Sequence, residues 1–240
     1  MRIYFLDISN LFFTFVNLLF MTTSTEENYL KAIYHLSHRP QQSVLTSEIA
    51  GILRTTSASV TDMLKKLSDK NLIDYQRYKG VRITRKGEKV ALSIIRRHRL
   101  WEVFLTEVLK FRWDEVHDMA EELEHVSSDE LVKRLDAYLG YPKFDPHGDP
   151  IPDTNGKLQA GTKKLFSEIL EPGHYVLSGV NDHRAAFLQF LEKKGLLPGT
   201  VVEVMEIDPF DRSMQVRFEN NNTSFISREV AQHIYIRLYE

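Results

Sequence analysis

The chain of 240 residues contains no cysteine. Disulfide bonds, thiolate zinc sites and cysteine nucleophiles are therefore excluded, and the composition fits a reducing compartment. Hydrophobic residues make up 42% and charged residues 27% of the chain, which excludes the low-hydrophobicity class of disordered proteins. We expect a cytoplasmic protein with one large or two to three small domains.

An apolar run long enough to cross a membrane is also lacking. Residues 1–20, MRIYFLDISNLFFTFVNLLF, are apolar and aromatic. The uninterrupted part after Asp7 is shorter than the ~20 residues of a membrane span, contains Asn10 and Asn17, and has no small-residue cleavage site. The stretch from Met21, MTTSTEENYL, is typical of the start of a soluble domain. We favour a start codon assigned too early, with a genuine apolar extension as the alternative.

The net charge of -2 conceals two regions of opposite sign. Residues 21–100 contain 15 Lys and Arg against 7 Asp and Glu, whereas residues 101–240 contain 15 against 25. A basic first part favours binding of a polyanion, and an acidic remainder favours binding of cations or of a partner.

The basic region has the element order of a winged helix-turn-helix. Apolar spacing predicts a helix from Thr25, a short helix over 47–53 and a third over 57–67. Two short strands around a turn at Lys79-Gly80 follow, as in a wing. The third helix is the predicted recognition helix, although such helical triads also occur in protein–protein modules.

The start of that third helix is rich in small hydrogen-bonding residues, where a recognition helix meets base edges. Basic residues flank it and would contact phosphates. The DNA-binding candidates are Thr56, Ser57, Ala58, Ser59, Thr61, Asp62, Lys65, Lys66, Arg77 and Lys79.

The segment from His98 to His125 contains two helical patterns that each gather imidazoles and carboxylates on one face. Together the two faces would offer three imidazoles and three carboxylates, a donor set for a divalent metal. The alternative is a pair of solvated amphipathic helices. The broad apolar surface of the first helix favours a dimer interface. The candidate donors are His98, Glu102, His117, Glu121, Glu124 and His125.

The remainder predicts a linker and a small β domain. Residues 142–162 are rich in Pro and Gly, which indicates a linker. Five short strands then occur within eighty residues, interrupted by a helix over 185–194, which indicates a small SH3-like barrel. Such barrels often bind peptides, and the sequence leaves that role open.

These motifs resemble those of the metal-dependent transcriptional repressors of the diphtheria toxin repressor and manganese transport regulator type. The resemblance covers residues 21–240, and its most specific motifs are EHVSSDEL and HGDPIP. It implies a mainly α fold with small β parts. The implied parts are an apolar extension (1–20), a winged helix-turn-helix domain (21–90), a helical metal-binding and dimerisation domain (91–141), a linker (142–162) and an SH3-like FeoA-type domain (163–240).

The resemblance further implies a homodimer that binds Mn²⁺ or Fe²⁺, then a palindromic operator, and represses metal-uptake genes. It places a regulatory metal site at Asn28, Glu121, Glu124 and His125, and a second site at His98, Glu102, His117 and Asp182. Iron-type members have sulfur ligands at the positions of Asn28 and Glu121. Oxygen donors in their place favour Mn²⁺ over Fe²⁺.

Two other functions compete with this one. Glu122 and His125 have the E-x-x-H spacing of helical di-metal enzymes, but the only other such spacing, Glu171 to His174, contains Pro and Gly and is unsuited to a helix. The other competitor is a metal-independent DNA-binding regulator whose His and Glu faces are structural. Metal titration separates it from a metal-activated repressor.

Overall fold

The structure is a computed structural model that describes residues 22–37, 43–76, 79–126, 128–158 and 164–239. It divides the chain into two compact units, Met1–Ile94 and Ile95–Glu240. The predicted apolar extension at residues 1–20 and the DNA-binding candidate Arg77 lie outside the described residues. Among the described residues, no helix is long and apolar enough to cross a membrane.

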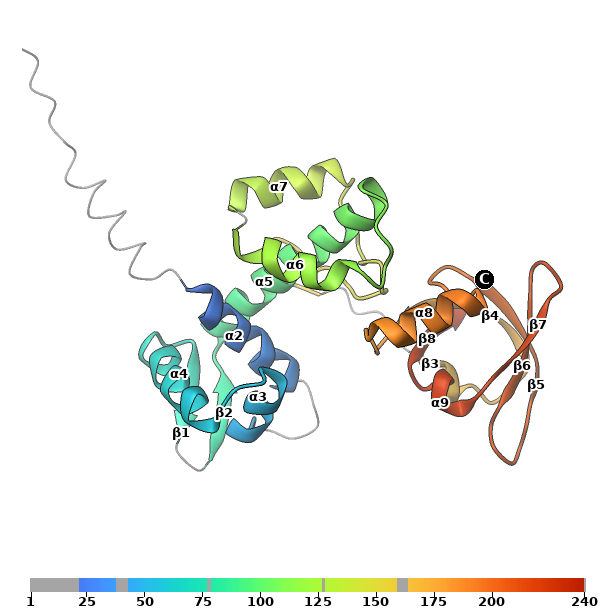
Figure 1. The fold of residues 1–240 in the computed structure, drawn as a ribbon, viewed down its shortest axis with the longest axis horizontal. Coiled ribbons are helices and arrows are strands. Elements are labelled where there is room, and N and C mark those ends of the chain that lie inside the picture. Colours follow the sequence, from blue (N-terminus) through green and yellow to red (C-terminus); the bar gives the residue numbers. More distant parts are fainter. Residues whose placement is uncertain (1–21, 38–42, 77–78, 127, 159–163, 240) are drawn as a thin grey trace, which may run out of the picture. The chain divides into compact units, whose positions relative to one another are not determined.

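The first unit contains the predicted winged helix-turn-helix (Figure 1). The apolar sides of its three helices are buried, and Val60, Leu64 and Leu67 on the third helix are completely inaccessible. Thr56 caps that helix, because its hydroxyl accepts a hydrogen bond from the backbone N–H of Ser59 at 3.2 Å. The elements are α2 (Ser24–Ser37), α3 (Thr46–Ile52), α4 (Ser57–Asp69), β1 (Ile73–Gln76) and β2 (Gly80–Ile83).

A long helix begins after Thr84, whose hydroxyl accepts a hydrogen bond from the backbone N–H of Gly87. This helix, α5 (Arg85–Val103), continues into a π-helical turn, η1 (Phe104–Val108). Apolar spacing predicts one continuous helix to Leu109 and does not reveal the wider turn. Single π-helical turns often occur beside functional sites, and this one begins two residues after Glu102.

Two further helices, α6 (Val116–Val126) and α7 (Asp129–Tyr138), accompany the second half of α5. Leu100 and Val103 of α5 pack with Leu135 of α7 in one buried cluster. Leu105 packs with Val116 of α6 in another. Ser128 caps α7 by accepting a hydrogen bond from the backbone N–H of Leu131.

The Pro- and Gly-rich stretch, predicted as a linker, forms a loop over residues 142–158 that packs on α5 and is here called the ordered loop. Ile151 is buried among residues of α5 and α7. Two arginines on successive turns of α5 hold the loop: Arg96 donates to the carbonyl of Pro152 at 2.6 Å, and Arg99 donates to that of Pro150 at 2.5 Å. Composition predicts a linker, and these carbonyl contacts together with the apolar anchor hold its described part against α5 and α7. Residues 159–163 lie outside the described residues.

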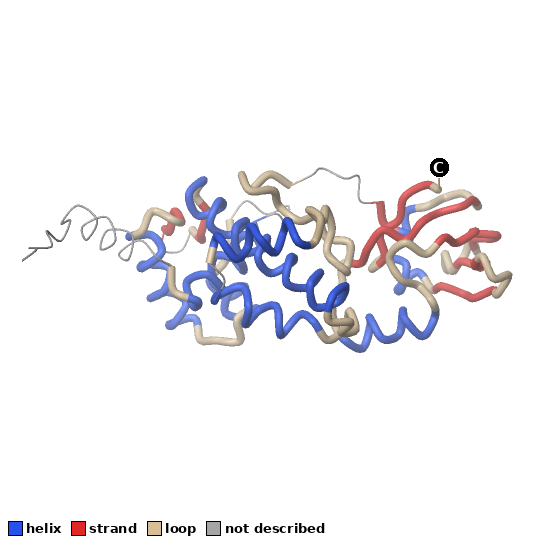
Figure 2. The backbone as a smooth tube through the Cα atoms, turned by 90° about the horizontal axis from the view of Figure 1, so that it is seen from above, coloured by secondary structure: helices blue, strands red, loops and turns tan. Residues whose placement is uncertain are grey.

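The C-terminal part is a six-stranded antiparallel sheet in the order β3-β8-β4-β5-β6-β7, visible as the large group of strands in Figure 2. Its strands are β3 (Lys164–Leu165), β4 (Gly173–Val180), β5 (Val201–Ile207), β6 (Met214–Phe218), β7 (Thr223–Ile226) and β8 (Ile234–Leu238). Helices α8 (Ala185–Lys194) and α9 (Arg228–Ala231) and a 3₁₀ turn, η2 (Phe166–Glu168), accompany it.

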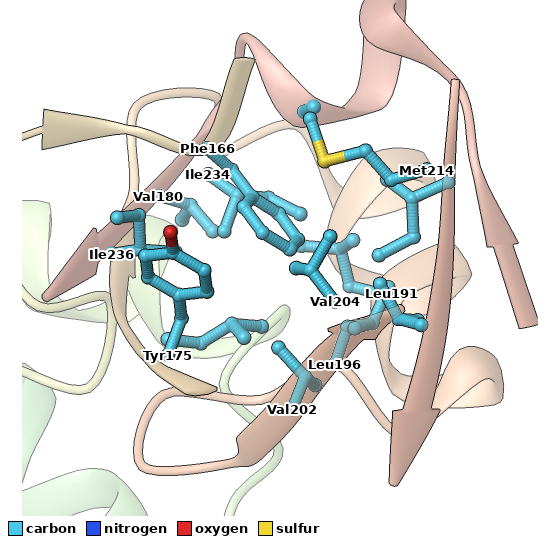
Figure 3. Close-up of a cluster of buried hydrophobic side chains, with 14 of the residues drawn as sticks. Phe166, Tyr175, Val180, Leu191, Leu196, Val202, Val204, Met214, Ile234 and Ile236 are labelled. Carbon is cyan, nitrogen blue, oxygen red and sulfur yellow. The ribbon is translucent and has the colours of Figure 1, made fainter. Parts of the chain in front are cut away.

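The predicted small β domain is thus confirmed, with an open rather than a fully paired sheet, since β3 and β7 are its edges. Its core is built from the apolar faces of the strands and of α8 (Figure 3). Phe166, Leu191 and Val202 are fully buried there. The sequence did not predict β3, η2 and α9, because two to four residues are too few to show a hydrophobic period.

The ordered loop and β4 approach each other backbone to backbone. The N–H of Val180 donates to the carbonyl of His147 at 2.9 Å. A Cβ on Gly148, whose φ is +84°, would lie 2.1 Å from the carbonyl oxygen of Ser178, and one on Gly179 would lie 2.6 Å from that of His147. Both positions therefore require glycine.

Candidate functional site

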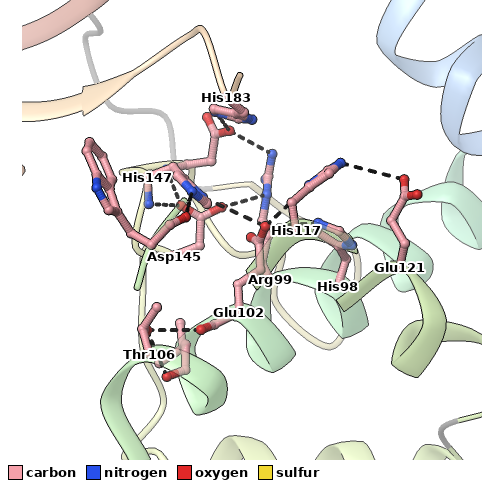
Figure 4. Close-up of polar contacts among 12 residues, drawn as sticks. His98, Arg99, Glu102, Thr106, His117, Glu121, Asp145, His147 and His183 are labelled. Atoms are coloured by element: carbon pink, nitrogen blue, oxygen red, sulfur yellow. Dashed lines mark hydrogen bonds and ion pairs between the residues drawn. The ribbon is translucent and has the colours of Figure 1, made fainter. Parts of the chain in front are cut away.

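Three imidazoles converge on one carboxylate oxygen in the second unit (Figure 4). The side chain of Glu102, on α5, is almost inaccessible. Its Oε1 atom lies 3.1 Å from Nε2 of His98, 3.5 Å from Nδ1 of His117 and 3.7 Å from Nδ1 of His147. The three rings come from α5, α6 and the ordered loop, so folding is needed to bring them together.

Two groups of three possible metal ligands share this carboxylate. One consists of His98, Glu102 and His117, and the other of Glu102, Asp145 and His147. Within each group the ligand atoms lie within 4.8 Å of one another. The first group contains only residues that the sequence predicts, whereas Asp145 and His147 were assigned to the linker.

The ring nitrogens fit a metal better than they fit an ordinary polar core. Nδ1 of His117 and Nδ1 of His147 are buried and have no hydrogen-bond partner among the described residues. A buried nitrogen without a partner costs about 1–3 kcal/mol, which ligation by a cation would offset. Imidazole nitrogens with carboxylate oxygens and no thiolate suit Mn²⁺ or Fe²⁺.

The imidazoles around Glu102 favour the ionised form of its carboxylate. Burial by itself would raise the pKa of Glu102, but the imidazoles of His117, His147 and His98 outweigh it and hold the pKa well below its usual range. For His147, burial lowers the pKa, yet Glu102, Asp145 and the carbonyl of Trp113 raise it overall. These shifts favour the ionised form of Glu102 and the protonated form of His147.

The residues predicted for the regulatory site lie beside this cluster. Glu124 on α6 is fully buried, with Oε2 at 2.6 Å from Nδ1 of His98 and Oε1 at 3.5 Å from Nε2 of His125. Glu121 is half exposed and lies 3.7 Å from Nε2 of His117. Among the described residues, Glu121, Glu124 and His125 do not form a three-ligand group within 4.8 Å. Asn28 lies on α2, half-buried, in the other unit.

Asp182, predicted as the ligand from the C-terminal domain, belongs to neither group. Its carboxylate accepts hydrogen bonds from the backbone N–H of Arg184 at 3.0 Å and from the guanidinium Nε of Arg184 at 2.9 Å. This guanidinium lowers the pKa of Asp182. The neighbouring His183 faces the cluster instead, with its ring centroid 4.8 Å from that of His147.

The ordered loop supplies the ligands that the sequence interpretation missed. Oδ1 of Asp145 accepts hydrogen bonds from the backbone N–H groups of His147 and Asp149, both at 2.9 Å. Burial, with the charges of Glu102 and Asp149, raises the pKa of Asp145 to about 7, while the charge of Arg99 opposes the rise. The alternation Asp-x-His-x-Asp in this loop was the available signal, but Pro and Gly favoured the linker interpretation.

The predicted DNA-binding residues that the structure describes lie on α4 and the wing. Thr56, Ser57, Ala58 and Ser59 are exposed at the start of α4, and Thr61 is half-buried, with its hydroxyl donating to the carbonyl of Ser57. Lys65, Lys66 and Lys79 are exposed as well. Asp62 forms a 3.0 Å ion pair with Lys65, which partly neutralises both side chains.

Three family models match consecutive parts of the chain. Residues 21–81 match the iron dependent repressor, N-terminal DNA binding domain. Residues 84–153 match the iron dependent repressor, metal binding and dimerisation domain, and residues 166–238 match the FeoA domain. The second match includes the ordered loop with Asp145 and His147.

Proteins with similar sequences are also named as repressors. The iron-dependent repressor IdeR of Mycobacterium leprae is 33% identical over 128 residues, which are 53% of this chain and 55% of IdeR, so that match spans about half the length of each. The diphtheria toxin repressor of Corynebacterium jeikeium is 25% identical over 232 residues, 87% of this chain and 94% of that protein.

Solved structures extend the similarity to most of the chain. A manganese-dependent transcriptional repressor in complex with manganese is 30% identical, with a TM-score of 0.78 over 89% of this chain and 100% of the other. The manganese regulator SloR is 34% identical, with a TM-score of 0.69 over 91% of this chain and 100% of the other. Such relatives are transcriptional repressors rather than enzymes. The chain therefore belongs to the family of metal-dependent transcriptional repressors that includes the diphtheria toxin repressor.

Proposed function

We propose that this chain is a cytoplasmic, homodimeric repressor that is activated by Mn²⁺ or Fe²⁺ and binds a palindromic operator of metal-uptake genes. The observation that carries this proposal is the convergence of three imidazoles on Oε1 of Glu102. The unit that precedes it presents a polar, exposed α4 suited to the major groove. A metal-dependent regulator needs both features.

The residues proposed to hold metal are those of the two groups around Glu102, together with Glu121, Glu124 and His125. A bound divalent cation would supply the positive charge that offsets repulsion among these carboxylates. Both ring nitrogens of His98 face carboxylates, with Glu124 at 2.6 Å and Glu102 at 3.1 Å, so a metal that binds this ring must displace one of these contacts. The role of Asn28 in the regulatory site stays a prediction.

Oxygen and imidazole ligands favour Mn²⁺ over softer ions. Because affinity for such a site rises from Mn²⁺ through Fe²⁺ to Zn²⁺, coordination number and cellular supply must provide the selectivity. The oxygen donors are the reason that we favour Mn²⁺ and keep Fe²⁺ as the alternative.

The test begins with selection of a duplex from a randomised DNA library in the presence of MnCl₂. Gel-shift titrations then compare the affinity of the full-length protein for that duplex with MnCl₂ and with EDTA. We expect at least a hundredfold tighter binding with Mn²⁺, since a switch needs a few kcal/mol of coupling. Equal affinity under both conditions would show that the protein binds DNA without metal.

Two ligand variants sharpen the test. Glu121→Ala and His125→Ala should lose the response to Mn²⁺ and remain dimers in sedimentation. Glu130→Ala on α7 is the control, because its exposed carboxylate forms an ion pair with the exposed Arg134 on the same helix and belongs to neither group of metal ligands. A normal Mn²⁺ response in the two ligand variants would remove these residues from the regulatory site.

A further inference from the structure

A pocket of about 560 Å³ lies where α5, α7 and the ordered loop meet. All the residues that line it belong to the second unit, and none of them belongs to either group of metal ligands. Its volume falls within the range of roughly 300–1,000 Å³ that is typical of small-molecule sites. The pocket is therefore a candidate for a ligand other than the metal.

Apolar surface and one aromatic residue form part of the lining. Ile151 is buried, Pro142 is half-buried, and Tyr141 is 67% exposed. The backbone of Tyr141 has a φ of 59°, which bulky residues rarely adopt, and its N–H donates to the carbonyl of Asp136 at 2.9 Å. Backbone strain of this kind often occurs at ligand sites. This part of the pocket suits the apolar body of a ligand.

Two lysines from opposite ends of the ordered loop line the same pocket. The carbonyl of Lys143 accepts a hydrogen bond from the N–H of Ile151 at 2.9 Å, and that of Lys157 accepts one from the N–H of Asp153 at 3.0 Å. These contacts place both lysines beside the segment 151–153. Neither ammonium group forms an ion pair or a hydrogen bond with a described residue. Two such charges at one pocket favour an anion.

The acidic residues of the pocket do not cancel this positive charge. Asp136 forms an ion pair with Arg96, so these two side chains neutralise each other. Oδ1 of Asp153 accepts hydrogen bonds from the backbone N–H groups of Lys157 and Asn155, both at 2.8 Å. These hydrogen bonds lower the pKa of Asp153, which is therefore ionised at neutral pH. Cationic side chains still outnumber anionic ones by three to two.

We propose that this pocket binds a small amphipathic anion, with its carboxylate or phosphate group held by Lys143 and Lys157. The apolar body of the ligand packs on Tyr141, Pro142 and Ile151. The hydroxyl of Thr154, which also lines the pocket, is a further donor to the anion. This site requires neither metal nor DNA, so it goes beyond the proposed function and stands or falls independently of it.

An occupant of the pocket has a structural consequence for the ordered loop. Lys143 and Lys157 lie close to the two ends of this loop, which spans residues 142–158. An anion held by both lysines would therefore fasten one end of the loop to the other. Because a ligand that binds only the folded state stabilises it, we expect the anion to raise the Tm of the metal-free protein.

Isothermal titration calorimetry of the full-length protein in EDTA tests the proposal with four probes. Phenyl phosphate and benzoate carry both an anionic group and an apolar ring, inorganic phosphate lacks the ring, and benzyl alcohol lacks the charge. We expect a Kd of about 0.1–1 mM for at least one aromatic anion and at least about fivefold weaker binding of inorganic phosphate and benzyl alcohol. The better of the two aromatic anions shows whether the pocket prefers phosphate or carboxylate.

Variants separate the charges from the ring. Lys143→Met combined with Lys157→Met removes both charges and keeps the apolar stems, and should weaken the aromatic anions about tenfold. Lys133→Met is the matched control, because Lys133 is exposed on α7 outside the pocket. Tyr141→Asn should weaken the aromatic anions but not inorganic phosphate, and Asn tolerates the left-handed backbone better than Tyr. Unchanged phosphate binding in this variant shows that the pocket is still folded.

Three results would overturn the proposal. The first is no binding of either aromatic anion up to about 10 mM, together with an unchanged Tm. The second is equal affinity for these anions in the double lysine variant and in Lys133→Met. The third is binding of benzyl alcohol as tight as that of phenyl phosphate and benzoate, which would show that the pocket does not select for charge.

Discussion

Nδ1 of His98 and Oε2 of Glu124 lie 2.6 Å apart in the protein interior. This contact joins the two metal sites that the family resemblance separates, because His98 was assigned to the second site and Glu124 to the regulatory site. Through its other nitrogen the same ring contacts Glu102. A ligand change on either side of His98 therefore alters the hydrogen bonding of the other side.

Glu124→Gln tests this connection while preserving size. Loss of the charge leaves His98 with one anionic partner instead of two. We expect the Mn²⁺ concentration that gives half-maximal DNA binding to rise at least tenfold, by analogy with other changes next to a metal ligand. Titration of DNA binding with MnCl₂ measures it. Glu122→Gln, an exposed neighbour on α6, is the control, and identical midpoints for the two variants would disprove the connection.

Arg99→Gln tests the attachment of the ordered loop to α5. The side chain of Arg99 is 13% exposed and lies 3.4 Å from Asp145 and 3.5 Å from Asp149, so its removal leaves two carboxylates facing each other. We expect the free energy of unfolding in EDTA to fall by about 2–4 kcal/mol. Urea titration is the measurement. Arg134→Gln, which breaks an exposed pair with Glu130, should change it by less than about 0.5 kcal/mol.

Lys66→Ala tests the DNA-binding face. Lys66 is exposed on α4 and is a predicted phosphate contact. Because each lost phosphate contact removes about 0.9 from the slope of log affinity against log salt, a dimer should lose about 1.8. Fluorescence anisotropy at several salt concentrations in MnCl₂ measures the slope. Lys133→Ala on α7 should leave it unchanged, and equal slopes for both variants would place Lys66 outside the interface.

The dependence of stability on pH is predicted for Asp114, which accepts hydrogen bonds from Gln189 at 2.7 Å and Arg112 at 2.9 Å. Burial raises the pKa of Asp114, but these two partners lower it overall. A lowered pKa stabilises the folded state above the unfolded pKa of about 3.9, and this contribution is lost as the pH falls through the folded pKa.

Asp114→Asn should accordingly lower the Tm by ~1–2 °C at pH 6, as expected for a partly exposed ion pair, and by less at pH 3.5. Calorimetry in EDTA at both pH values gives the comparison. A difference that grows toward low pH would contradict the direction of the pKa shift.

The fold could be predicted where hydrophobic periods are long. Val60, Leu64 and Leu67 follow the helical spacing of α4 and are all buried. The helix over 185–194 ends where Gly195 adopts a left-handed φ of 72°, as its sequence indicates. The sequence did not predict the π-helical turn η1, because packing rather than residue type decides between α-helical and π-helical hydrogen bonding.

The candidate site was predictable only where its ligands share a helix. His98 and Glu102 are four residues apart, and helical geometry alone brings them together. Asp145 and His147 reach the same carboxylate through a loop whose path depends on Arg96 and Arg99, contacts that no local spacing reveals. Asp182 was predicted as a further ligand, but its carboxylate accepts a hydrogen bond from the guanidinium of Arg184, a contact that sequence spacing does not reveal.

Gly148 and Gly179 approach each other closely, so main-chain atoms rather than side chains form the junction between the ordered loop and β4. Single substitutions elsewhere on β4 leave the hydrogen bond from Val180 to His147 in place, since any residue except proline supplies the N–H. An insertion or deletion in β4 would shift that register and displace His147. Across homologues, this junction should therefore tolerate divergent side chains but keep a constant strand length and two glycines.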